Sequence, residues 1–192
     1  KAPFYRFEKK SKEYEYLKNC REKLGGPIPT REDNVSPIKI PEISIFQELL
    51  SGTGKREIST TMAYVRLLTL LTKDKTIGKR VVPIIPDEAR TFGMEGMFRQ
   101  LGIYTSEGQK YIPNDRDQVM YYREDQSGQI LEEGINEAGA MAAWMACATS
   151  YSTNDYPLIP FYVYYSMFGF QRIGDLAWAA GDMRSRGFLI GG

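Results

Sequence analysis

The spacing of apolar residues changes along the chain and predicts alternating helices and strands. Between residues 58 and 71 apolar positions return every three or four residues, which predicts an amphipathic helix. Residues 81–85 form a short, β-branched apolar run that predicts a buried strand, although Pro83 inside it cannot donate a backbone hydrogen bond. A shorter helix is predicted at 93–101.

The rest of the chain continues this alternation. Strands are predicted at 119–122, 158–165 and 187–190, and helices at 133–150 and 171–184. Strands that alternate with helices predict an α/β fold, with a mostly parallel sheet and helices on both of its faces. Ligands of such sheets bind beyond the C-terminal ends of the strands. This rule directs attention to Asp87, Glu88 and residues 165–168.

The first 55 residues have a different texture. Charged residues mixed with tyrosines at helical spacing predict an exposed helix that starts near Lys9 and ends near Gly25 and Gly26. Regular structure is then disfavoured by four prolines, Pro27, Pro29, Pro37 and Pro41. We therefore expect a linker at about 26–55, with a short helix at 45–50, before an α/β domain at 56–192.

Composition narrows the possible functions. The 192 residues include no histidine, which excludes Ser-His-Asp and Cys-His mechanisms and histidine-based metal sites within this chain. Cys20 and Cys147 are too few for an all-cysteine metal site, and their separation favours a reducing, cytoplasmic setting. A net charge of +1 argues against nucleic-acid binding driven by bulk charge. No apolar run approaches the ~18–20 residues that span a bilayer.

Both ends suggest a piece of a larger protein. The chain begins at Lys1 without a methionine or a signal-peptide pattern. It stops at an apolar run followed by Gly191 and Gly192, which is typical of a strand that leads into a loop.

Glutamates near the predicted helix at 133–150 are the first candidates for chemistry. Glu132 and Glu133 at its start are interpreted as solvated residues, favoured by the positive end of the helix. Glu137 lies one turn further in, among alanines and glycines that allow close packing. Since burying an unpaired charge is costly, Glu137 is expected to be either paired or functional.

Six aromatic residues crowd the ten positions 161–170. A core strand with alternating faces explains Phe161 and Val163. Aromatics at its C-terminal end, such as Tyr165 and Phe168, are suited to stack on a flat ring.

Charged residues near the two strand ends admit simpler explanations. Arg172 and Asp175 are spaced for a local ion pair on a helix, and so are Asp87 and Arg90. A functional role explains Asp87 and Glu88 equally well, because these two carboxylates lie together at an edge where ligands bind.

Four segments together resemble one enzyme family. They are EISTT at 57–61, DEARTFGMEG at 87–96, GINE at 134–137 and YYSMFGFQRIGD at 164–175. The chain resembles the homodimeric bacterial pyruvate dehydrogenase (acetyl-transferring) components, almost unbroken from about Glu57 to Gly192 and more loosely before that.

This resemblance implies a thiamine-diphosphate enzyme built like transketolase, which decarboxylates pyruvate and acetylates the lipoyl group of dihydrolipoyl acetyltransferase. Residues 1–55 would end the preceding diphosphate-binding domain and form a linker, and residues 56–192 would be the aminopyrimidine-binding domain, truncated at its C-terminal end. The family's Gly-Asp-Gly diphosphate motif and its histidines are absent. The resemblance therefore implies that the magnesium ligands lie outside this chain and that the chain alone is inactive.

Roles for single residues also follow from the resemblance. Glu137 matches the catalytic glutamate, whose carboxyl group bonds a pyrimidine nitrogen and favours the imino tautomer of the cofactor. Tyr165 and Phe168 match the aromatics that hold the aminopyrimidine ring. Glu88, with Asp87 beside it, matches acidic residues near the active-site channel, where proton handling or coupling between sites is expected.

The family also implies a homodimer with the cofactor between subunits and a contact helix that starts near Glu133. Two alternatives stay open: a non-catalytic α/β dimerisation module, and another thiamine-dependent 2-oxo acid dehydrogenase.

Overall fold

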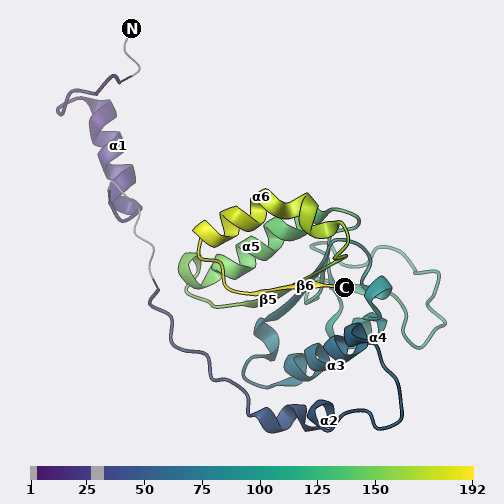
Figure 1. The fold of residues 1–192 in the computed structure, drawn as a ribbon. Helices are drawn as coiled ribbons and strands as arrows, with labels where there is room; N and C mark the ends of the chain where they lie inside the picture. The colour runs from purple at the N-terminus through teal and green to yellow at the C-terminus, as the bar shows by residue number, and fades with distance from the viewer. Residues whose placement is uncertain (1–3, 27–32) are drawn as a thin grey trace. The chain divides into compact units, whose positions relative to one another are not determined.

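A computed structural model of the chain describes residues 4–26 and 33–192 (Figure 1). Its contacts divide the chain into two compact units, Lys1–Asn34 and Val35–Gly192. Pro27 and Pro29 of the expected linker lie outside the described residues.

The first unit contains helix α1 (Lys12–Lys23), which confirms the predicted exposed helix. Ser11 caps it, because its hydroxyl oxygen accepts a hydrogen bond of 3.1 Å from the Tyr14 amide. Acidic residues in the first turn and basic residues in the last turn complement the helix dipole. No residue of α1 is buried, so this helix has no core of its own.

The second unit is built on a four-stranded sheet in which neighbouring strands are parallel. In spatial order its strands are β4 (Leu131–Glu132), β1 (Val81–Ile85), β5 (Ile159–Tyr164) and β6 (Phe188–Gly191). This sheet confirms the predicted fold class and the strands predicted at 81–85, 158–165 and 187–190. Two further short strands, β2 (Ile103–Tyr104) and β3 (Glu124–Asp125), pair with each other.

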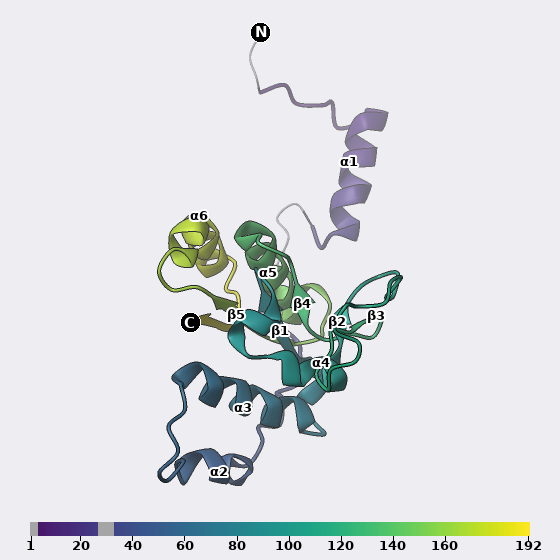
Figure 2. The same ribbon diagram turned by 90° about the vertical axis from the view of Figure 1, so that its right-hand side faces the viewer.

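Helices cover both faces of this sheet, as predicted (Figure 2). On one face lie α3 (Thr60–Lys73) and α4 (Glu95–Leu101), and on the other lie α5 (Glu137–Thr153) and α6 (Gly169–Asp182). Short helical turns complete the unit: Ile43–Phe46, α2 (Gln47–Leu50), Gly78–Arg80 and Ala89–Phe92.

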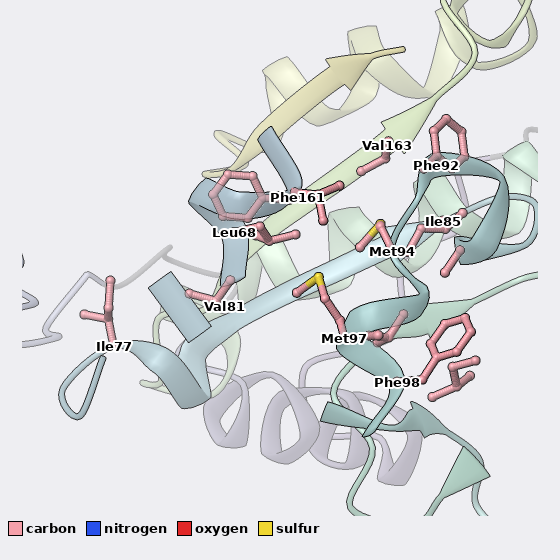
Figure 3. Packing of buried hydrophobic residues seen from close by; sticks show 14 residues of the cluster. Leu68, Ile77, Val81, Ile85, Phe92, Met94, Met97, Phe98, Phe161 and Val163 are labelled. Carbon is pink, nitrogen blue, oxygen red and sulfur yellow. The ribbon is translucent and has the colours of Figure 1, made fainter. Parts of the chain in front are cut away.

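The central strands sort their side chains into two core layers. In β1, Val81 and Ile85 belong to the layer of α3 and α4, whereas Val82 and Ile84 belong to the layer of α5 and α6. Figure 3 shows the first layer, where Leu68 of α3 is fully buried. Burying one such side chain stabilises the fold by roughly 1.5–3 kcal/mol. The buried strands therefore fix the positions of the loops at their C-terminal ends.

One predicted strand is wrong. Residues 119–122 lie in a loop, with Val119 78% exposed and Met120 46% exposed. The Tyr122 amide donates to Asp115 Oδ2 at 3.0 Å, not to a neighbouring strand. The run was too short to bury an apolar face.

The segment before α3 joins the second unit. Helix α2 and the turn before it confirm the short helix predicted at 45–50, and Ile38 packs against the core of α3 and α4. The expected domain boundary between residues 55 and 56 stays a prediction.

Candidate functional site

The sheet has a point where the chain leaves two neighbouring strands in opposite directions. From β1 it next joins the sheet as β4, and from β5 it joins as β6. Such a point opens a crevice at the C-terminal ends of the two strands, where parallel sheets bind ligands. Asp87 follows β1 and Tyr165 follows β5, and the Tyr165 hydroxyl donates a hydrogen bond of 2.9 Å to Asp87 Oδ2.

From this hydrogen bond a chain of contacts leads to Glu137. The rings of Tyr165 and Phe168 lie 5.5 Å apart between centroids. The Arg172 guanidinium lies over the Phe168 ring, 4.4 Å from its centroid, and its Nη1 donates to Glu137 Oε1. We call these five residues, Asp87, Glu137, Tyr165, Phe168 and Arg172, the aromatic cluster.

Glu137 owes its position to a tight turn between β4 and α5. Gly134 (φ 58°) and Ile135 (φ 45°) are both left-handed, a conformation that is strained for a β-branched residue such as Ile135. Asn136 then caps the helix by accepting a hydrogen bond of 3.0 Å from the Gly139 amide. Helix α5 therefore begins at Glu137 itself and not near residue 133, so Glu137 is its first residue and does not lie one turn in.

The carboxylate of Glu137 is partly buried and paired, with 13% of its side chain exposed. The sequence predicted that Glu137 is either paired or functional, and in the structure it pairs with Arg172. The local pair of Arg172 with Asp175 was a wrong prediction. Helices α5 and α6 pack against each other, so Arg172 reaches across to the more buried carboxylate, while Asp175 is exposed.

The pair expected between Asp87 and Arg90 is also wrong. Arg90 pairs with Asp115, while Asp87 accepts the Tyr165 hydrogen bond. Residues 89–92 form a 3₁₀ turn, and the Arg90 side chain in it pairs with Asp115.

Beside the aromatic cluster lies a hollow of about 570 Å³. It is lined by Glu88, Arg90, Tyr111, Pro113, Asn114, Asp115, Tyr122, Glu132 and Gly134. We call it the acidic cavity. Glu88 is exposed and lines this cavity.

Glu132 was predicted to be solvated, and this prediction is wrong. It is the last residue of β4, and its Oε1 accepts a hydrogen bond of 3.1 Å from the Ala89 amide. Its Oε2 is buried and has no hydrogen-bond partner among the described residues. Burial is the main cause that raises the pKa of Glu132 to about 7; the Ala89 hydrogen bond opposes this rise, and the nearby charges of Glu88 and Asp87 contribute to it.

A tyrosine shares this environment. The Tyr122 hydroxyl donates to Glu124 Oε1 at 3.1 Å. Burial raises the pKa of Tyr122, and the charge of Glu132 adds to this effect. The acidic cavity can thus hold and release a proton at Glu132 near neutral pH, while Tyr122 keeps its proton.

The two sites differ in what they can bind. The aromatic cluster offers a ring face and a carboxylate to a flat molecule that donates hydrogen bonds.

Within residues 4–26 and 33–192, no three His, Cys, Asp or Glu side chains come together in a way that could hold a metal ion. The described helices include none that is long and apolar enough to cross a membrane.

Sequence reasoning missed three contributions to these sites. Phe92 packs against Tyr165, with 4.9 Å between ring centroids, yet only its place in the 87–96 segment pointed to it. The sequence placed Arg172 only in a local pair with Asp175. Glu132 directly follows Ile130 and Leu131, and this apolar pair was the available signal for a strand that would bury it.

Comparison with known proteins gives a consistent result. The chain matches the family described as the pyruvate dehydrogenase E1 component middle domain over residues 38–192. It is 63% identical over 192 residues to the pyruvate dehydrogenase E1 component of Pseudomonas aeruginosa. It is 62% identical over 192 residues to that of Cupriavidus necator and 59% identical over 193 residues to that of Escherichia coli K12. Each match covers 100% of this chain and 22% of the relative, so the chain spans about a fifth of the length of these relatives.

Proposed function

The chain belongs to the family of pyruvate dehydrogenase E1 components, and we propose that it is part of a thiamine-diphosphate-dependent pyruvate dehydrogenase. The full-length protein would decarboxylate pyruvate and transfer the acetyl group to the lipoyl group of dihydrolipoyl acetyltransferase. Residues 56–192 would form its aminopyrimidine-binding domain. The observation that carries this proposal is that Glu137 and Phe168 converge on one position, where a flat hydrogen-bond donor already lies.

The aromatic cluster divides the work of holding the cofactor ring. Phe168 and Tyr165 would stack against the aminopyrimidine, and Asp87 would fix the Tyr165 ring through their hydrogen bond. Glu137 would hold a proton between its carboxyl group and a ring nitrogen, which favours the imino tautomer. When bound, thiamine diphosphate supplies the thiazolium carbon that attacks pyruvate and takes up the electrons released with carbon dioxide.

The acidic cavity would handle protons next to this ring. Since the pKa of Glu132 is raised to about 7, its carboxyl group exists in both forms at neutral pH. Acid–base catalysis is most effective with such groups. Glu88 lines the cavity, and the charge of Asp87 acts on Glu132 within it, so we assign the passage of protons to and from the active-site channel to these acidic residues.

The remaining parts of the assignment concern assembly. Phe170 and Trp178 of α6 are 49% and 81% exposed, and apolar surface of this kind usually meets a partner, which supports a homodimer. Residues 1–55 would end the diphosphate-binding domain and form a linker. Magnesium would be held by ligands outside this chain, and the protein would work in the cytoplasm.

Glu137→Gln in the full-length protein tests this function. Glutamine keeps the volume and a hydrogen-bonding group but loses the acidic proton. A positioned acid–base group contributes ~10²–10⁴ to the rate, so carbon dioxide release should fall by about that factor while the protein stays folded. Asp175→Asn removes an exposed carboxylate from α6 outside the cluster and should leave turnover unchanged.

The alternatives predict other results. If Glu137 only supports packing in a dimerisation module, the change lowers stability by about 1–3 kcal/mol and activity follows the folded fraction. A stable Glu137→Gln variant that retains more than about a tenth of the turnover would remove the catalytic assignment. A different thiamine-dependent dehydrogenase would release carbon dioxide faster from a larger 2-oxo acid than from pyruvate.

A further inference from the structure

Arg172 lies where the proposed function needs the cofactor ring to lie. Its guanidinium covers the Phe168 ring at 4.4 Å, and its Nη1 donates to Glu137 Oε1. One flat group therefore satisfies both the aromatic face and the carboxylate. Asp175, the acidic neighbour one helical turn away, is left without this partner.

The shape and chemistry of a guanidinium explain why it fits here. It is planar and cationic, it stacks on aromatic faces, and it carries N–H donors along its edge. An aminopyrimidine ring is also planar, stacks on the same face, and meets a carboxyl group along its edge. Resting on the proposed function, we infer that Arg172 occupies the aminopyrimidine subsite between Phe168 and Glu137 and is displaced when the ring binds.

The two partners of Arg172 are unequal in a way that permits this exchange. The Arg172 side chain is 52% exposed, whereas that of Glu137 is 13% exposed. Arg172 lies in the first turn of α6 and can turn into water, where a guanidinium is well solvated. Glu137 begins α5 and stays beside the core, so after the exchange its carboxyl group is offered to the incoming ring.

The surroundings of Glu137 make a replacement partner necessary. Next to it, the Tyr162 hydroxyl is buried and has no hydrogen-bond partner among the described residues. Burial raises the pKa of Tyr162, and the charge of Glu137 adds to this effect. A carboxylate in this setting is costly without a donor. When Arg172 withdraws, the proton shared between the Glu137 carboxyl group and the ring nitrogen replaces the hydrogen bond that is lost.

Competition for one subsite predicts that removing Arg172 strengthens cofactor binding. The test compares the cofactor-free full-length protein with its Arg172→Met variant, which keeps an unbranched apolar side chain. Thiamine diphosphate with Mg²⁺ is titrated by calorimetry. A half-exposed ion pair and one cation–π contact together oppose binding by about three- to tenfold, so the variant should bind the cofactor tighter by that factor.

Three controls separate this result from other causes. Inorganic diphosphate with Mg²⁺ carries no ring, so Arg172→Met should not change its affinity. Arg172→Lys keeps the charge but lacks the planar face, and its cofactor affinity should lie between those of the wild type and the Arg172→Met variant. Arg186 stacks on the Tyr151 ring at 3.7 Å, away from the aromatic cluster, and Arg186→Met should leave cofactor affinity unchanged.

The outcomes distinguish the inference from the function beneath it. Equal or weaker cofactor binding by a folded Arg172→Met variant, with the wild type binding normally, would overturn the inference alone, because Arg172 would then support the site. A tighter affinity for both ligands would also overturn it, since the effect would not depend on the ring. Failure of every variant, the wild type included, to bind thiamine diphosphate would overturn the proposed function as well.

Discussion

The aromatic cluster and the acidic cavity lie at the same edge of the sheet but treat their carboxylates in opposite ways. In the aromatic cluster, Asp87 accepts from the Tyr165 hydroxyl and Glu137 accepts from Arg172. In the acidic cavity, one oxygen of Glu132 is buried without a partner among the described residues. Two regions of similar composition therefore reach different chemical states.

The difference shows that the number of hydrogen-bond donors near a carboxylate, more than its burial alone, decides whether it takes up a proton. Paired carboxylates are held in position by their hydrogen-bond donors and are suited to binding. A buried carboxylate with too few donors takes up a proton instead and is suited to proton exchange. The following predictions test this contrast in the full-length protein.

The largest effect is expected from Glu132→Gln. The pKa of Glu132 is about 7 in the folded protein and near 4.5 when unfolded, so the folded state binds more protons between these values. Stability supplied by the protonated group is full below pH 4.5 and is lost as pH rises through about 7. Glutamine cannot ionise, so the variant should exceed the wild type by about 1–2 kcal/mol at pH 8, allowing for solvent screening at the cavity mouth, and by little at pH 5.

Urea unfolding at pH 5 and pH 8 measures this difference. Glu88→Gln is the matched control, because Glu88 lines the same cavity but is exposed, and it should change stability little at either pH. Equal stabilisation by both variants at pH 8 would mean that general charge repulsion, and not the burial of Glu132, is responsible.

A middle-sized effect is expected from Tyr165→Phe in the aromatic cluster. The change removes the donor to Asp87 and should cost about 1 kcal/mol in the free energy of unfolding. Cofactor affinity should change little, because the ring that stacks is kept. Tyr111→Phe is the control, since its hydroxyl donates to Glu124 at 3.2 Å from a side chain that is 54% exposed. A larger loss for Tyr111→Phe would contradict the importance of the Asp87 bond.

The smallest effect is expected from Arg90→Gln at the rim of the acidic cavity. Arg90 pairs with Asp115, with 38% and 19% of their side chains exposed, and the loss should be about 0.5–1 kcal/mol. Lys110 pairs with Glu107 at about two-thirds exposure on both sides, so Lys110→Gln should stay within ~0.5 kcal/mol of the wild type. Thermal melts in which Lys110→Gln loses more stability than Arg90→Gln would show that side-chain exposure does not determine how much these ion pairs contribute.

The fold could be predicted largely from periodicity, and the reason lies in its central strands. β1 and β5 are buried apolar runs, and the helices α3 and α6 have clear apolar stripes. The short strands β2, β3 and β4 could not be predicted, because each is two residues long and two residues show no periodicity. Residues 119–122 resembled a strand only in composition.

The site was predictable in its members but not in its contacts. Asp87, Tyr165 and Phe168 could be placed at strand ends by sequence and by the family resemblance, and the structure brings them together. Which charges pair could not be predicted, because helix spacing offers Arg172 the nearby Asp175, while Glu137 is brought to it only by the packing of α5 on α6.

The most direct test of the ring-binding claim is a crystal structure of the full-length protein with thiamine diphosphate and Mg²⁺. We predict that the aminopyrimidine ring stacks on Phe168, with a ring nitrogen ~2.6–3.0 Å from the Glu137 carboxyl group and Arg172 turned away from both. A bound cofactor whose ring lies elsewhere, with Arg172 still between Phe168 and Glu137, would contradict the claim.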